Sequence, residues 1–142
     1  MDEPQWITRT MLDAIHADQI RRFGGLSGVN ADGLISLALS RPRDRWESAE
    51  AEYVDLAQLA AAYGFALSKN QGYRDANDRV AFMAMYVFLG LNGQRLVASP
   101  DQVVRLMEAV ASGEREELAT WLRDHMEPME ADVSPADSSD TS

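Results

Sequence analysis

Apolar residues recur every three or four positions through most of the chain, the spacing typical of amphipathic helices. No run alternates apolar and polar residues for long enough to predict several strands. Residues 50–69 carry a wide apolar arc, and residues 76–91 have few polar positions after their first turn. Segments of this kind are typical of central, buried helices. We therefore predict an all-α fold with these two helices at its core.

Start and stop signals indicate where the other helices lie. Ser99-Pro100-Asp101-Gln102 has the pattern of a capping box followed by proline at the first helical position. Gly24-Gly25 is a typical helix stop, and a helix should end before Pro42 because the residue preceding proline avoids the α region. The predicted helices are residues 8–22, 31–40, 50–69, 76–91, 99–113 and 114–125, with an extended connection over residues 94–98.

Length and composition limit the domain number and the chemistry. The chain has 142 residues, of which 46% are hydrophobic, enough for one domain with a substantial core. No stretch approaches the ~18 apolar residues that span a bilayer, so we expect a soluble, cytoplasmic protein. The absence of cysteine excludes disulfides and thiolate chemistry. With only His16 and His125 available, any metal should be a hard cation on oxygen ligands.

The net charge of −10 argues against a general nucleic-acid binder, which needs clustered lysine and arginine. Half of this charge lies from Glu127 onward, in a segment of Pro, Ser, Asp and Thr with little to bury. We therefore predict one domain over residues 1–126 and a disordered acidic tail over residues 127–142. Arg41, Arg43 and Arg45 are expected in a basic loop between helices; a solvated loop is favoured over contact with an acidic target or phosphates.

Residues 71–79, Gln-Gly-Tyr-Arg-Asp-Ala-Asn-Asp-Arg, connect the two central helices, so the last of them begin a helix. A helix start offers unpaired N–H groups and a positive dipole end, which together favour anions. Arg79 adds a forked cation and Asn77 a side-chain amide for phosphate oxygens. Asp75 offers a carboxylate to a magnesium ion that bridges phosphates. The segment is a candidate phosphate-binding loop.

Each residue of this loop also has a simpler interpretation. Asp75 is a suitable helix N-cap, and Arg79 could cover a helix flank or pair with Asp75 four residues earlier. Gly72 is an ordinary loop residue, and Tyr73 could anchor the loop in the core. Taken singly, these simpler interpretations are favoured, so the assignment depends on the whole pattern.

The pattern resembles the signature of the Fic/Doc superfamily, H-x-F-x-[DE]-[AG]-N-[GK]-R. The matching positions are Tyr73, Asp75, Ala76, Asn77 and Arg79. The flanking residues resemble the death-on-curing (Doc) branch, and the resemblance spans residues 7–122. Segments that contribute are Ile15-His16, residues 22–28, residues 38–42, Lys69-Asn70 and Val80-Ala81-Phe82.

The resemblance implies a compact six-helix Fic fold and a toxin of a type II toxin–antitoxin pair, with ATP and Mg²⁺ as cofactors. Most Fic proteins transfer AMP to hydroxyl groups, whereas the Doc branch resembles a kinase that phosphorylates a threonine of elongation factor Tu and stops translation. The implied partner is a small Phd-like antitoxin. The family pattern places the catalytic base at position 71, magnesium on Asp75, and nucleotide contacts at Gly72, Tyr73, Asn77, Asp78 and Arg79.

Two positions depart from the family pattern. Gln71 replaces the catalytic His, and a neutral amide cannot take a proton from a hydroxyl group. General-base catalysis is typically worth ~100- to 10,000-fold in rate, so we expect a weak or silent enzyme. Asp78 replaces Gly or Lys; at about 4 Å in a dielectric near 20 it would repel a phosphate charge by roughly 4 kcal/mol, although an acid there favours the helix start.

Several explanations stay open from the sequence. The chain could be an inactive laboratory variant, a natural pseudoenzyme, an AMP-transferring Fic enzyme or an enzyme with different chemistry. A non-catalytic Fic-fold binding module, holding an antitoxin in a hydrophobic groove beside its first helices, is the competing hypothesis. His16 is the one other candidate base, but its position beside Ile15 is more typical of a structural histidine.

Overall fold

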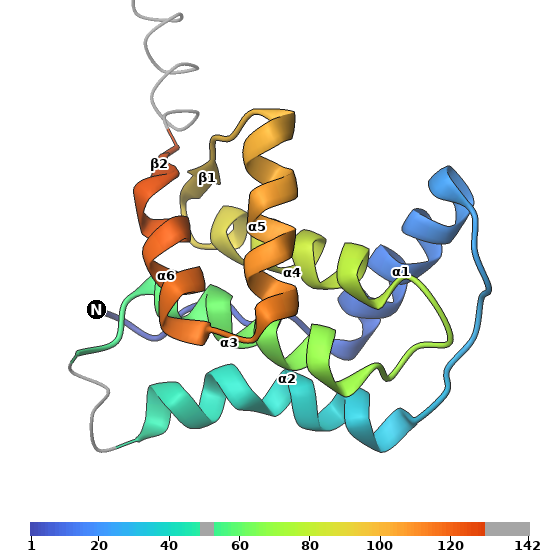
Figure 1. Ribbon diagram of the computed structural model, residues 1–142. Helices are drawn as coiled ribbons and strands as arrows, with labels where there is room; N and C mark the ends of the chain where they lie inside the picture. The colour runs from blue at the N-terminus through green and yellow to red at the C-terminus, as the bar shows by residue number, and fades with distance from the viewer. Residues whose placement is uncertain (49–52, 130–142) are drawn as a thin grey trace, which may run out of the picture.

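Helices make up nearly all of the regular structure in this computed structural model, which describes residues 1–48 and 53–129. Figure 1 shows the helices gathered around α3 and α4, with the short β1–β2 sheet at one end of the molecule. This arrangement confirms the predicted all-α class. The elements are α1 Arg9–Phe23, α2 Asp32–Glu47, α3 Leu56–Asn70, α4 Asn77–Leu91, β1 Gln94–Leu96, α5 Pro100–Ser112, α6 Arg115–Asp124 and β2 Met126–Pro128.

The two most apolar helices, α3 and α4, pack against each other at the centre of the domain. Gly64 allows this close approach, because a Cβ there would lie 2.3 Å from the sulfur of Met85. The buried rings of Tyr63 and Phe88 meet across the same interface at 5.1 Å. Helices α2 and α6 pack against α3, and α1 packs against α4. The loop between α3 and α4 is thus fixed at both ends by the core.

The second helix is longer than its proline predicts. It continues through Pro42 to Glu47, so the expected stop at residue 40 is wrong. Pro42 has no N–H for the carbonyl of Ala38, a loss typically worth ~3 kcal/mol in a helix interior. Both residues are buried in the face that packs on α3, and this burial offsets the loss. Arg41, Arg43 and Arg45 consequently lie on a helix rather than in a loop.

The third helix starts later than predicted. It begins at Leu56, because Asp55 and Gln58 form a capping box in which each side chain accepts from the other's backbone N–H. Val54 precedes the helix yet is buried. Because its side chain is apolar, the sequence pattern had placed it on the buried face of the predicted helix. The predicted start at Glu50 lies outside the described residues. The predicted capping box of α5, between Ser99 and Gln102, is confirmed.

The C-terminal boundary of the domain lies beyond the predicted one. β1 pairs antiparallel with β2, so Glu127 and Pro128 belong to a strand rather than to the predicted tail. Arg95 and Glu127 form an ion pair across this ribbon. The rest of the predicted tail, residues 130–142, lies outside the described residues. Over the described part of the chain, none of the helices has the length and apolarity to cross a bilayer.

Candidate functional site

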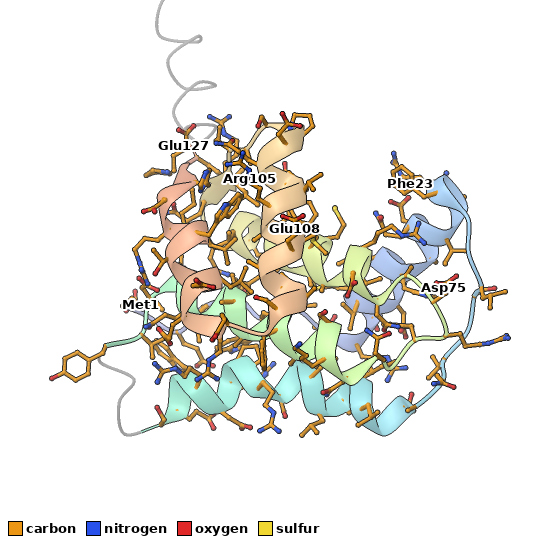
Figure 2. All side chains as sticks on the ribbon, in the orientation of Figure 1. Met1, Phe23, Asp75, Arg105, Glu108 and Glu127 are labelled. Carbon is orange, nitrogen blue, oxygen red and sulfur yellow. The ribbon has the colours of Figure 1, made fainter. Side chains whose placement is uncertain are left out.

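The α3–α4 loop is held in a strained backbone conformation by contacts with the α1–α2 connection. Gln71 and Ala76, at its two ends, are non-glycine residues with left-handed φ values of 51° and 66°. Such residues cost roughly 1–3 kcal/mol each and persist where their surroundings fix them. The carbonyl of Gly72 accepts from the N–H groups of Asn30 and Ala31, both at 2.9 Å. Figure 2 shows Asp75 at this edge, where the loop faces the connection.

The loop leaves the start of α4 open to an anion. The N-cap Ala76 provides no side-chain bond to the helix, and its own N–H donates to the Asp75 carboxylate. The N–H groups of Asn77, Asp78 and Arg79 have no hydrogen-bond partner among the described residues. They adjoin a polar hollow of about 280 Å³. Its lining residues are Gln71, Arg74, Asp75, Ala76, Asn77, Asp78 and Arg79.

Asp75 lies beside this hollow as an ionised carboxylate. Its oxygens accept from Leu26 N at 3.0 Å and from Ala76 N at 2.8 Å, and these bonds hold the pKa of the carboxyl below its ordinary value. It is not the N-cap of α4, because Ala76 occupies that position. Each oxygen keeps a free lone pair, so Asp75 fits one Mg²⁺ position completed by phosphates and water. The described residues contain no group of three metal-binding side chains.

Gln71 is exposed, and both ends of its side-chain amide hydrogen-bond to the protein. Its amide nitrogen donates to the carbonyl of Ser68, and its oxygen accepts from Asn77 Nδ2 at 3.4 Å. The side chain therefore closes the end of α3 and lines the hollow. It brings no group there that could take a proton at neutral pH.

The side chain of Asn77 hydrogen-bonds to the backbone of the loop. Its Oδ1 accepts from Tyr73 N at 3.0 Å and its Nδ2 donates to Tyr73 O at 2.9 Å. The side chain is buried and its amide already has partners, so a phosphate would contact the backbone N–H of this residue first.

Gly72 and Tyr73, both predicted nucleotide contacts, do not line the hollow. A Cβ on Gly72 would lie 2.4 Å from Ile35 Cγ1, so glycine is needed there for packing. Tyr73 is buried, stacks on His16 at 4.1 Å, and donates its hydroxyl to Asp13 at 2.7 Å. His16 in turn contacts the carbonyl of Asp75 at 3.1 Å. Asp13, His16 and Tyr73 thus hold the buried side of the loop by packing and hydrogen bonds. This agrees with the structural role predicted for His16.

Arg79 connects the loop helix to the end of α1. Its guanidinium donates to Gln19 O at 3.2 Å and Gly24 O at 3.0 Å, and it lies 5.9 Å from the ring of Phe23. These carbonyls belong to the negative end of α1, where a cation is favourable. The pairing with Asp75 that four-residue spacing allows is replaced by these bonds, although the Arg79 charge still helps to lower the pKa of Asp75.

Asp78 is exposed, and its carboxylate is directed toward α3. Ser68 Oγ donates to Asp78 Oδ1 at 2.8 Å. The residue also borders a second, larger groove of about 730 Å³ between α1, α4 and α5. Phe23, Phe82, Met83, Val103 and Met107 provide its apolar lining, and Asp78 and Arg79 belong to both hollows.

The sequence also matches a known protein family. The model of the Fic/DOC family matches residues 6–89, which include α1 to most of α4 and the whole loop. The chain belongs to the Fic/DOC family. A Fic/DOC relative, the protein kinase doc of Escherichia phage P1, is 33% identical over 103 residues, covering 72% of this chain and 79% of the phage protein. The toxin Doc of Mycolicibacterium smegmatis is 36% identical over 92 residues, covering 63% of this chain and 70% of that toxin. These relatives place the chain in the Doc branch of the Fic/DOC family.

Three supporting residues of this Fic/DOC loop were missed from the sequence. Ser68 binds Asp78, Asp13 binds Tyr73, and the backbone of Leu26 binds Asp75. Asp13 and Leu26 lie 60 and 49 residues from their partners, and no local spacing indicates such contacts. Ser68 lies in the last turn of α3, where only the fold shows that it faces the start of α4.

Proposed function

We propose that this chain is a Doc-like toxin whose loop is an ancestral ATP-phosphate site with weak or no transfer activity of its own. The observation that carries the proposal is the open first turn of α4, whose N–H groups at Asn77, Asp78 and Arg79 adjoin the ionised Asp75 in a member of the Doc branch. An anion site beside a carboxylate suited to Mg²⁺ is what a nucleotide triphosphate needs.

The ancestral reaction would move the γ-phosphate of ATP to a protein hydroxyl. The hydroxyl oxygen bonds to the γ-phosphorus, the bond from that phosphorus to the bridging oxygen breaks, ADP leaves, and the hydroxyl proton must go to a base. In this chain the α4 N–H groups orient the phosphates and Asp75 would hold Mg²⁺, which neutralises phosphate charge when bound. Gln71 occupies the position of the base and cannot accept the proton, so this step is the one most impaired.

The proposed partners are those that the resemblance to the Doc branch implies, and the larger groove offers a place for one of them. A threonine of elongation factor Tu is the proposed phosphate acceptor, and translation in the cytoplasm the proposed process. A Phd-like antitoxin is the proposed binding partner. The apolar groove between α1, α4 and α5 suits one face of an amphipathic helix, and it ends at Asp78 and Arg79, beside the loop. An antitoxin segment in this groove would cover the start of the phosphate site.

A non-catalytic binding module is the second candidate, and one observation favours it. The side chains of Asn77 and Arg79 hydrogen-bond to the loop and to the end of α1, so two predicted phosphate ligands have structural partners. A chain that keeps only its partner groove would retain these contacts for stability. AMP transfer is a further alternative within the same site, because the loop itself does not fix which phosphorus is attacked.

The test restores both family residues in the full chain, as Gln71→His with Asp78→Lys. Purified protein is incubated with Mg²⁺, elongation factor Tu and ATP labelled at either the γ- or the α-phosphate. The proposal expects γ-label on the factor, at least ~100-fold above the unchanged chain. The matched control adds Asp75→Ala to the restored variant and should abolish transfer.

The outcomes separate the candidates. Transfer of the α-label would assign AMP transfer instead. No transfer of either label by a restored variant that folds normally would reject the ancestral kinase and favour the binding module. Tight antitoxin binding by the unchanged chain together with no transfer by the restored variant is the result expected of that module.

A further inference from the structure

A further cavity, of about 410 Å³, lies between α2, the second half of α3 and the start of α6. It shares no lining residue with the hollow at the start of α4. Its charged residues are Arg41, Asp44 and Arg45 from α2, Lys69 from α3 and Arg115 from α6, and Phe65 provides an aromatic surface. Among the described residues that line the cavity, four are cations and one is a carboxylate, in a chain whose net charge is −10.

Three of these cations have no ion pair among the described residues. Several arginines elsewhere do form ion pairs with nearby acids, as Arg22 does with Asp18 and Arg123 does with Asp55. Within residues 1–48 and 53–129, Arg41 and Arg115 make no ion pair, and Lys69 donates only to the carbonyl of Ala111. Like charges around one cavity repel one another, and an anion in the cavity relieves that repulsion.

The walls of the cavity are fixed by packing. Asn70 Nδ2 donates to Leu34 O at 3.0 Å, which holds the end of α3 to α2. Lys69 Nζ is positioned by its bond to Ala111 at 3.1 Å and lies 5.8 Å from the ring centre of Phe65. Gly113 packs closely on this amine, since a Cβ there would lie 3.0 Å from Nζ. The amine is therefore held in place before any ligand arrives.

Arg41 and Arg45 carry groups suited to binding phosphate. Arg41 and Arg45 are one helical turn apart, so both project from the same face of α2. A guanidinium presents paired N–H donors that match two oxygens of one phosphate group. The cavity volume is within the range of small-molecule sites, which is ~300–1,000 Å³.

We propose that this cavity binds a small molecule carrying two or more phosphate groups, either a nucleotide or an inorganic polyphosphate. The phosphates lie among Arg41, Arg45, Lys69 and Arg115, and a nucleotide base has the exposed part of Phe65 beside it. The site is independent of the loop at the start of α4 and does not need transfer activity. Lys69 and Asn70 connect it directly to Gln71 along the chain.

The test is a nuclear magnetic resonance titration of the full, isotope-labelled chain with inorganic pyrophosphate in metal-free buffer. We expect saturable shifts of the backbone signals of Phe65, Lys69, Asn70 and Arg115. The double variant Arg41→Gln/Arg115→Gln should weaken the affinity at least ~10-fold, because two charge-assisted contacts to the phosphates are lost. Arg105→Gln, on α5 and labelled in Figure 2, removes an exposed arginine that does not line the cavity and should leave the affinity unchanged.

A second arm replaces pyrophosphate with metal-free ATP and distinguishes the two sources. Tighter binding of ATP with larger shifts at Phe65 supports a nucleotide, and equal affinities support the phosphates alone. Shifts confined to residues 76–79, or equal affinities of the double variant and Arg105→Gln, would overturn the proposal. Binding of single-stranded RNA at this cavity without binding of pyrophosphate or ATP would overturn it as well. Failure of the kinase test above leaves each of these readouts unaffected, because none involves phosphate transfer.

Discussion

The side chain of Asn77 closes the loop onto the backbone of Tyr73, accepting from its N–H at 3.0 Å and donating to its carbonyl at 2.9 Å. These two bonds replace the pairing that a strand or helix would give to a buried backbone unit. They also fix the direction in which the chain enters α4. The open N–H groups of the first turn therefore depend on a side chain that points away from them.

Replacing Asn77 with alanine should destabilise the fold by about 2–4 kcal/mol, because two buried backbone groups of Tyr73 lose their partners. Asn77→Asp keeps the acceptor but places a buried carboxylate oxygen against the carbonyl of Tyr73, so its loss should be at least as large. Urea unfolding followed by circular dichroism measures both. Asn30→Ala is the control, because the hydrogen bond of this exposed residue comes from its backbone. Equal stability of Asn77→Ala and the control would show that Asn77 does not brace the loop.

Gly72→Ala should also be destabilising, for a steric reason. The new Cβ would lie 2.4 Å from Ile35 Cγ1 and 3.3 Å from the carbonyl of Ala31, so α2 or the loop must move. Overpacking of this kind typically costs ~1–3 kcal/mol. Gly90→Ala is the control: it lies in α4 with nothing within 4 Å, and alanine should stabilise that helix by about 0.5–1 kcal/mol. Thermal unfolding of the two variants should therefore shift in opposite directions.

The helical periodicity predicted the core because burial and helical spacing agree in α3 and α4. It failed where local preference and burial disagree. At Pro42 the local rule ends the helix, but packing of α2 on α3 keeps it. At Val54 an apolar residue is buried outside any helix, and the capping box at Asp55 starts α3 only afterwards. Both errors arise from contacts between segments that the spacing of residues along the chain does not show.

The sequence predicted where the candidate site lies but not which groups its residues contact. The position of the loop and the chemistry of Asp75 and Gln71 could be predicted, because they depend on a helix start and on side-chain type. The partners of Arg79 could not, since Gln19 and Gly24 lie 60 and 55 residues away along the chain. Tyr73 was predicted as a nucleotide contact on family resemblance, and its buried stack on His16 became visible only with the fold.

Tyr73→Phe should make the fold less stable in a pH-dependent way. Burial alone would raise the pKa of Asp13, but the hydrogen bonds from the Tyr73 hydroxyl and from Arg9 outweigh it and lower that pKa in the folded state. Such a carboxylate stabilises the fold above its unfolded pKa of about 3.9, and the contribution disappears as the pH falls through the folded pKa. Because the Asp13 side chain is 49% exposed, the variant should lose about 1 kcal/mol at neutral pH.

Urea unfolding at a series of pH values measures this effect. The difference between the unchanged chain and Tyr73→Phe should be largest near neutral pH and should shrink below about pH 4, where Asp13 is protonated in the unfolded chain. Tyr86→Phe is the control, because that ring is 43% exposed and its hydroxyl makes no hydrogen bond with the described residues. A difference that stays constant down to the acid limit would show that Asp13 is not the partner that matters.

Asp78→Asn separates the charge of Asp78 from its contact with Ser68. The amide oxygen can still accept from Ser68 Oγ, so the geometry of the first turn is kept while the negative charge is removed. Since Asp78 is exposed and directed toward α3, we expect solvent to screen its repulsion of a phosphate to less than the roughly 4 kcal/mol expected at about 4 Å. We expect affinity for Mg²⁺-ATP to rise by about tenfold at low salt, measured by calorimetry, and the gain to shrink at high salt.

The α4 helix of the Asp78→Asn variant should lose about 0.3–1 kcal/mol of stability, because an acid in its first turn is favourable. Asp101→Asn, in the first turn of α5, should cause a similar loss of stability with no gain in affinity. Equal nucleotide affinities of the two variants would show that Asp78 does not oppose the anion.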